Sequence, residues 1–334
     1  MHTLQRFWLL IALTWLPGSV FATSGTTQSF SADTTRLVHV SAAKAVLLVD
    51  DAIFSAMQST QTRGWKKRTT VSTLDGKHTM SPSLSQLRFK GHTYLPVTTD
   101  LVDDSKSFDV YETVILQFSD KNPVKPKLVR AHSGTDTGLY FTGLMKYDAT
   151  LFATTSDGTI EFTRDADVWQ TITPTGLPEG MISDAASNKD GLYVLVDGVI
   201  YTSQDGQSWT AVSGTYSTQA AVVSMTAKGH DLLVVTQNAA GKSSVWQQEN
   251  GGDFERILSN QQRVDLVTWG GADLYVVTRG TSARTFTVHK RSAGDTDFTE
   301  VLNGKGVVQD ATLVDSTMMF VARSNGKNHL VVLE

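Results

Sequence analysis

The 334-residue chain contains no cysteine, which excludes disulfide bonds, cysteine-ligated metal sites and a lipid anchor attached at a cleavage-site cysteine. Its eight histidines are scattered, and no two have the spacing His-x-His or His-x-x-x-His that favours zinc binding. No Gly-x-Ser-x-Gly elbow and no glycine-rich phosphate loop occurs. The sequence therefore predicts no metal, no cofactor and no assembled catalytic set.

Excess positive charge is also lacking. The formal net charge of −4 argues against nucleic acid or an anionic membrane surface as the partner. Two acidic pairs, Asp50-Asp51 and Asp103-Asp104, follow or lie near apolar runs. Paired carboxylates can bind calcium or run acid–base hydrolysis, but neighbours at strand ends are more typical of solvated turns, and we interpret them so.

Long apolar runs are absent after the first 16 residues. Phe7–Leu16 is a ten-residue apolar run that follows Arg6 and precedes Pro17 and Gly18, and Val20-Phe21-Ala22 has the form of a cleavage site. Ten helical residues rise about 15 Å, which is too short for a hydrocarbon core of about 30 Å. We predict a signal peptide at 1–22, a periplasmic or secreted protein that does not span a membrane, and a monomeric mature domain at 23–334.

A strand-like apolar run recurs roughly every 40 residues. Clear copies begin at residues 151 (LFATT), 192 (LYVLV), 232 (LLVVT), 274 (LYVVT) and 318 (MMFVA), and weaker copies begin at 94 (YLPVTT) and 46 (VLLVD). Repeats of this length are typical of β-propellers, with one blade per repeat. A β-sandwich is the alternative all-β fold, but it does not explain the repeat.

Four strand-like segments per repeat predict an all-β, seven-bladed β-propeller of four-stranded antiparallel blades. The last repeat contains only three such segments before Glu334. Residues 26–32 (TTQSFSA) resemble 206–212 (GQSWTAV), with Phe30 in the place of Trp209. We therefore expect an N-terminal strand to complete the last blade and close the ring.

The segment TSQDGQSW (202–209) resembles the Asp-box, or BNR repeat, of sialidase-like propellers, a superfamily that also includes assembly factors. The positions that carry the resemblance are Ser203, Asp205, Gly206 and Trp209, with a partial copy at Asp165 and Trp169. The resemblance implies a structural turn on the face opposite the ligand site, so Asp205 is not interpreted as catalytic.

The parts of a sialidase active site are not recognisable. Tyr111 and Glu112 are adjacent, which places their side chains on opposite faces of a strand. The repeated Gly-Trp of the assembly-factor type is missing too. The sequence favours an exported, non-catalytic propeller that binds a protein or a glycan as a scaffold. The alternative is a glycan-active hydrolase whose carboxylates come from several blades around the central funnel, so an enzymatic role stays open.

The interval between the runs at 94 and 151 is longer than the others. It contains a Pro- and Lys-rich stretch at 119–138, which suggests a projecting basic loop. Lys121, Lys125 and Lys127 are the candidate binding residues, and a surface excursion without function is the alternative.

Overall fold

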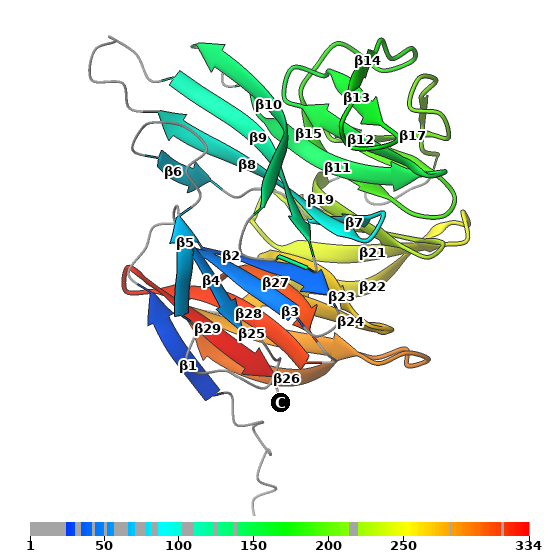
Figure 1. Ribbon diagram of the computed structural model, residues 1–334. Coiled ribbons are helices and arrows are strands. Elements are labelled where there is room, and N and C mark those ends of the chain that lie inside the picture. Colours follow the sequence, from blue (N-terminus) through cyan, green and yellow to red (C-terminus); the bar gives the residue numbers. More distant parts are fainter. Residues whose placement is uncertain are drawn as a thin grey trace, which may run out of the picture.

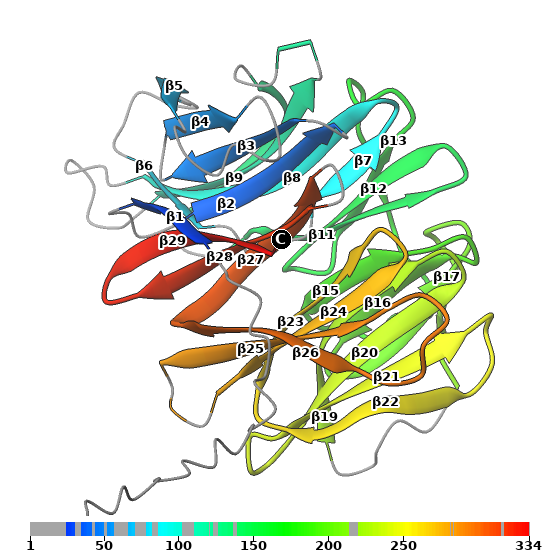
Figure 2. The same ribbon diagram turned by 90° about the horizontal axis from the view of Figure 1, so that it is seen from below.

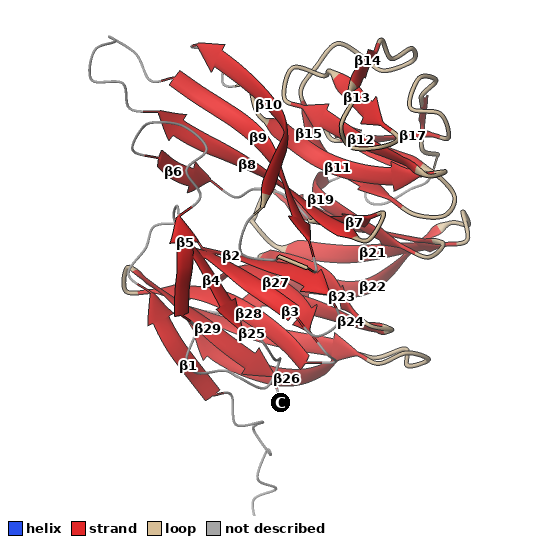
Figure 3. Ribbon diagram, viewed as in Figure 1, coloured by secondary structure: helices blue, strands red, loops and turns tan. Residues whose placement is uncertain are grey.

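The computed structural model describes residues 25–30, 35–41, 44–49, 52–56, 66–70, 78–81, 86–101, 110–119, 121–122, 126–135, 139–213, 220–280, 282, 284–314 and 317–333. Every regular element in these ranges is a β-strand (Figure 3). The expected signal peptide lies outside them. None of the described segments is a helix long and apolar enough to cross a membrane.

In the described ranges, six sheets are four-stranded antiparallel blades, arranged around the molecule in chain order with one five-stranded sheet between the first two (Figure 2). The first consists of β2 (Thr35–Ser41), β3 (Lys44–Val49), β4 (Ala52–Ala56) and β5 (Lys66–Thr70). The next two consist of β11 (Phe141–Tyr147), β12 (Thr150–Thr155), β13 (Ile160–Thr163) and β14 (Gln170–Ile172), and of β15 (Ile182–Ser187), β16 (Leu192–Val196), β17 (Val199–Ser203) and β18 (Thr210–Ala211).

The remaining blades lie in the C-terminal half. They are formed by β19 (Ala220–Lys228), β20 (Asp231–Asn238), β21 (Ser243–Glu249) and β22 (Phe254–Gln261), and by β23 (Val264–Gly270), β24 (Asp273–Arg279), β25 (Thr285–Arg291) and β26 (Thr299–Lys305). The last blade contains β27 (Val307–Val314), β28 (Thr317–Ser324), β29 (Lys327–Leu333) and β1 (Gly25–Phe30).

The N-terminal strand completes this last blade, as predicted. β1 pairs antiparallel with β29, from Gly25 opposite Val332 to Phe30 opposite Asn328. The first and the last described strands therefore lie side by side in one sheet (Figure 1). The pairing covers an edge of β29 that would otherwise expose unpaired backbone groups.

The prediction of seven four-stranded blades is wrong, because only six sheets in the described residues have that form. The sheet between the β2–β5 and β11–β14 blades has five strands: β6 (His78–Ser81), β7 (Leu87–Phe89), β8 (His92–Leu101), β9 (Val110–Ser119) and β10 (Lys127–Thr135). Both β6 and β7 pair with β8, which is ten residues long and accommodates two short strands on one edge. The apolar run at 94–99 belongs to this long strand.

In the second strand of a blade, alternate residues pack into two different hydrophobic cores, which explains the continuous apolar runs. In β16, Leu192 and Val194 pack with Phe152 of the preceding blade. Tyr193 and Leu195 pack with Leu232 and other residues of the following blade. A strand buried on both faces has no polar alternation, so it is the most visible segment of the repeat.

Candidate functional site in the central cavity

The innermost strands share a β-bulge near their first residues. The register shifts between Ile182 and Asp184 in β15, and the same shift recurs in β19, β23 and β27 after Val222, Val264 and Val308. A bulge adds one residue and re-aims the side chains that follow it. The repeated shift brings the residues after it to one level around the centre of the propeller.

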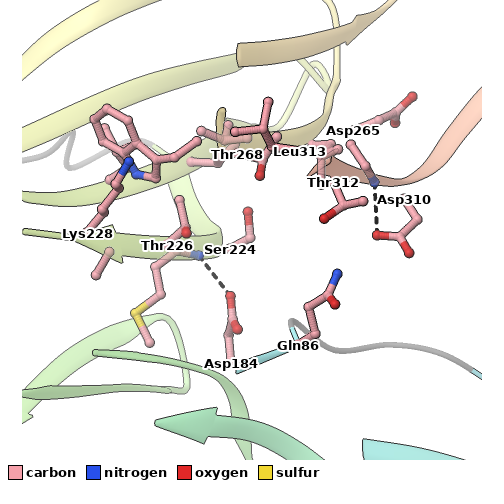
Figure 4. Close-up of a pocket in the computed structure, with 18 of the residues that line it drawn as sticks. Gln86, Asp184, Ser224, Thr226, Lys228, Asp265, Thr268, Asp310, Thr312 and Leu313 are labelled. Atoms are coloured by element: carbon pink, nitrogen blue, oxygen red, sulfur yellow. Dashed lines mark hydrogen bonds between the residues drawn. The ribbon is translucent and has the colours of Figure 1, made fainter. Parts of the chain in front are cut away.

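These four strands, together with Gln86 and with Leu233 and Val235 of β20, line a cavity of about 690 Å³ (Figure 4). The uncharged polar side chains that line it are hydroxyls and amides, namely Gln86, Ser224, Thr226, Thr268, Gln309 and Thr312. The volume lies within the range of about 300–1,000 Å³ that is usual for ligand pockets. The site is therefore a ligand-sized cavity with a mixed polar and apolar lining, formed mainly by the inner strands of four blades.

Asp184 links two blades at the wall of this cavity. Its Oδ2 accepts a hydrogen bond from the Met225 backbone N–H of the next blade at 2.8 Å, and its Oδ1 accepts one from the Ala185 N–H at 2.8 Å. Desolvation raises the pKa of Asp184 to about 6, and the two backbone hydrogen bonds oppose this shift only in part. The carboxylate thus binds an otherwise unpaired N–H on the free edge of β19.

The other two carboxylates of the cavity also have structural partners. Asp310 Oδ1 accepts a hydrogen bond from the Ala311 N–H at 2.9 Å, which repeats the local geometry of Asp184. Asp265 has a nearly buried side chain and forms a two-point ion pair with Arg279, at 2.8 and 3.2 Å. Each of these carboxylates is held by a donor of the protein itself. This arrangement is more typical of a structural role in the cavity wall than of a pair of groups that transfer a proton.

A cation marks one end of the cavity. Lys228 Nζ lies 5.4 Å from the centre of the Trp269 ring and donates a hydrogen bond to the Gly271 carbonyl. Lys228 is the one cation, and Trp269 the one aromatic residue, among the described residues that line the cavity. The ammonium group therefore covers the aromatic face that a flat ligand would use.

Two of the three lysines proposed as binding residues lie in the described part of the chain, and their binding role stays a prediction. Lys127 begins β10, and its Nζ pairs with Asp167 Oδ1 of the next blade at 2.6 Å. The hydrogen bond and charge of Asp167 raise the pKa of Lys127. Lys121 is exposed beside β9, and Lys125 lies outside the described residues. Neither Lys121 nor Lys127 lines the central cavity.

The Ser203–Trp209 loop is held by its own hydrogen bonds. Asp205 Oδ1 accepts hydrogen bonds from the Ser203 hydroxyl and from the N–H groups of Gln207 and Ser208, at 2.8 to 2.9 Å. Gly206 has a φ of +75°, and the indole N–H of the buried Trp209 donates to its carbonyl at 2.9 Å. Oδ1 of Asp205 thus accepts three hydrogen bonds from within its own loop.

The partial copy of this loop has the same geometry with one difference. Asp165 accepts from Thr163 Oγ1 and from the N–H groups of Asp167 and Val168, and the backbone bonds lower the pKa of Asp165 to about 2. Ala166 takes the place of the glycine, with a φ of +69°. Trp169 packs against the core beneath the five-stranded sheet.

Sequence reasoning missed the carboxylates of the cavity. Asp184 and Asp310 occupy the same phase of the repeat, in Ile182-Ser183-Asp184-Ala185 and Val308-Gln309-Asp310-Ala311. The signal that could have revealed these residues is an acidic side chain at the same position of two inner strands. No group of three or more His, Asp or Glu side chains with metal-binding geometry occurs in the described ranges.

Comparison with known proteins agrees with the fold. Residues 144–253 match the family model described as DUF6242 beta propeller domain. No curated protein matches the sequence.

Several solved propellers are similar in structure at low identity. The structure titled YCF48 bound to D1 peptide has a TM-score of 0.58 at 10% identity, with 92% of this chain and 97% of that chain covered. YCF48 from Cyanidioschyzon merolae has a TM-score of 0.57 at 8% identity, with 92% and 98% covered. The extracellular domain of the putative hybrid two component system BT4673 from B. thetaiotaomicron has a TM-score of 0.59 at 10% identity, with 90% and 38% covered. These likenesses show that the chain is a β-propeller, and the resemblance to sialidase-like propellers stays a prediction.

Proposed function

We propose that the chain is an exported, non-catalytic binding protein that takes a segment of a partner polypeptide at the central cavity. Export rests on the signal peptide expected at 1–22. The observation that carries the binding role is the cavity itself. It has the volume of a ligand site, and each of its three carboxylates is held by a backbone N–H or by an arginine.

The lining favours a polypeptide over a glycan. Hydroxyl and amide side chains on several strands can exchange hydrogen bonds with peptide groups. Sugar rings stack on open aromatic faces, whereas the one aromatic side chain of the described lining, Trp269, lies beneath Lys228. The similar YCF48 was solved with a D1 peptide bound, which supports the same kind of ligand here.

Site-directed photo-crosslinking tests this proposal. A benzoylphenylalanine at Leu313, which lines the cavity, is expected to yield one discrete adduct with a polypeptide in the native host. The same group at Thr299, exposed on the outer strand β26, is the matched control. Ser224→Phe fills the cavity and is expected to abolish the Leu313 adduct. Equal adducts at both positions, or turnover of a glycan that Asp184→Asn abolishes, would contradict the proposal.

A further inference from the structure

A second cavity, of about 200 Å³, lies between the β11–β14 and β15–β18 blades. We call it the interblade pocket. Five of the residues that line it are apolar, namely Pro174, Leu177, Pro178, Ile182 and Val196. The others are Asp157, Gly158, Glu179 and Gly180.

Two hairpin turns and the β14–β15 connection converge to form this pocket. Ile182 pairs with Val196, which pairs with Val199 across the Asp197-Gly198 turn. Gly180 allows the close approach, because a Cβ there would lie 2.8 Å from Asp197 Oδ2. The pocket is therefore fixed by strand register and by a glycine contact between segments.

Exposed apolar side chains extend the pocket at its rim. Met181 is 47% exposed and Val199 41% exposed, which is high for such side chains. Val199 lies on the same sheet face as its cross-strand partner Val196, which lines the pocket. The hydroxyl of Tyr140 reaches the Met181 sulfur at 3.6 Å. The apolar surface thus runs from the pocket to the start of β15.

Three carboxylates, and therefore three negative charges, lie at the rim of the pocket. Asp157 and Glu179 line the pocket, and Asp197 contacts Gly180 beside it. Within the described residues, no ion pair joins any of the three to a cation. An apolar pocket ringed by uncompensated negative charge is complementary to an apolar side chain next to positive charge.

The interblade pocket lies at the end of the blades where the inner strands begin, and the central cavity reaches from there along these strands to Lys228 and Leu313 at their far ends. β17 runs from Val199, at the pocket, to Ser203, so the Ser203–Trp209 loop lies at the opposite end. Ile182 lines the pocket, and Asp184, two residues along β15, lines the central cavity. One extended segment could therefore contact both.

We infer that the interblade pocket docks a segment of a partner protein in which apolar side chains alternate with lysine or arginine. The inference rests on the proposed function, because both require a polypeptide ligand. It adds the chemistry of that ligand: a leucine-like side chain enters the pocket, and its cationic neighbours pair with Glu179 and Asp197.

Methyl NMR of the mature protein labelled at its methionine methyl groups tests the inference. The probes are three acetylated, amidated hexapeptides, in which leucine alternates with lysine, leucine alternates with glutamate, or serine alternates with lysine. Met181→Leu identifies the Met181 signal. The Leu/Lys peptide is expected to shift that signal saturably and to bind at least tenfold more tightly than the other two. Equal binding of the Leu/Glu peptide would overturn the charge argument.

Charge variants make the test specific. Glu179→Lys with Asp197→Asn is expected to weaken binding of the Leu/Lys peptide about tenfold. Asp295→Lys with Asp297→Asn changes the net charge equally, on the β25–β26 loop, and is expected to change binding less than twofold. Equal effects of both pairs would refute the site.

The crosslinking experiment separates this inference from the proposed function. A Leu313 adduct, together with a Met181 methyl signal that the peptides do not shift, would overturn the interblade pocket and leave the central cavity in place. A shift of the Met181 methyl signal without a Leu313 adduct would overturn the central cavity as the binding site and leave the interblade pocket in place.

Discussion

Replacing Glu161 by glutamine tests whether an ion cluster fastens the five-stranded sheet to the next blade. Glu161 lies on β13 with a side chain only 2% exposed. It accepts hydrogen bonds from Arg130, at 2.9 Å from Nε, and from His132, at 3.1 Å. Both partners come from β10, so the carboxylate joins the five-stranded sheet to the blade that follows it in the chain.

The pKa of Glu161 gives the magnitude. Burial raises this pKa, but hydrogen bonds from His132 and Arg130 outweigh burial and lower it from 4.5 to about 2. At about 1.4 kcal/mol per unit, the shift corresponds to about 3 kcal/mol of stability at neutral pH. Because the folded-state pKa is depressed, this stability is present above pH 4.5 and is lost as the pH falls toward 2. About 2 kcal/mol is gone by pH 3.

Urea unfolding at pH 7 and pH 3 measures the effect. Glu161→Gln is expected to lower the free energy of unfolding by about 3 kcal/mol at pH 7, and the difference from the natural protein is expected to shrink to about 1 kcal/mol at pH 3. Asp295→Asn, on an exposed loop, is the control and is expected to change neither value. A difference of the same size at both pH values would refute the electrostatic reasoning.

Three further predictions follow from single features of the fold. Asp184→Asn is expected to remove a loss of stability of about 2–3 kcal/mol between pH 4 and pH 6, because the raised folded-state pKa makes ionisation destabilising there; unfolding curves across this window measure it. Gly206→Ala is expected to lower the free energy of unfolding by more than 2 kcal/mol, since the Cβ would lie 2.6 Å from a phenylalanine ring. Ala166→Gly relieves a positive φ and is expected to raise the free energy of unfolding by about 0.5 kcal/mol in the same urea assay. A chain that begins at residue 31 lacks β1 and is expected to melt about 5–10 °C lower by calorimetry; an unchanged melting temperature would contradict closure by this strand.

The sequence predicted the strands that are buried on both faces. Segments such as 192–196 are continuous apolar runs because each face packs against a different blade, so the propeller class and its repeat could be recognised. The outer strand of the last blade could be placed as well, since 26–32 resembles 206–212 and the chain lacked a fourth C-terminal strand.

The number of four-stranded blades could not be predicted in the same way. The repeat counts apolar runs, and the run at 94–99 has the same appearance whether its strand has five residues or ten. The pairing of β6 and β7 with one edge of β8 depends on tertiary contacts that no local pattern records. The long interval before residue 151 was the visible sign that this unit differed from the others.

The candidate site was harder to predict, because its residues obey no spacing rule. Asp184, Asp265 and Asp310 come from three separate inner strands and meet only when the ring closes. Sequence reasoning gave weight to a lysine-rich segment instead, and Lys127 from that segment pairs with Asp167 of the neighbouring blade.

The two ends of the blades differ in how their polar groups are satisfied. At one end, the carboxylates of Asp165 and Asp205 accept hydrogen bonds from their own loops, so they offer little to a ligand. At the other end, Glu179 and Asp197 have no cationic partner among the described residues, and they border exposed apolar side chains. Unpaired charge beside apolar surface gains most from a partner, because binding both desolvates the apolar groups and compensates the charge. This contrast supports the proposal that a partner binds at the end that holds the interblade pocket, to which the central cavity extends.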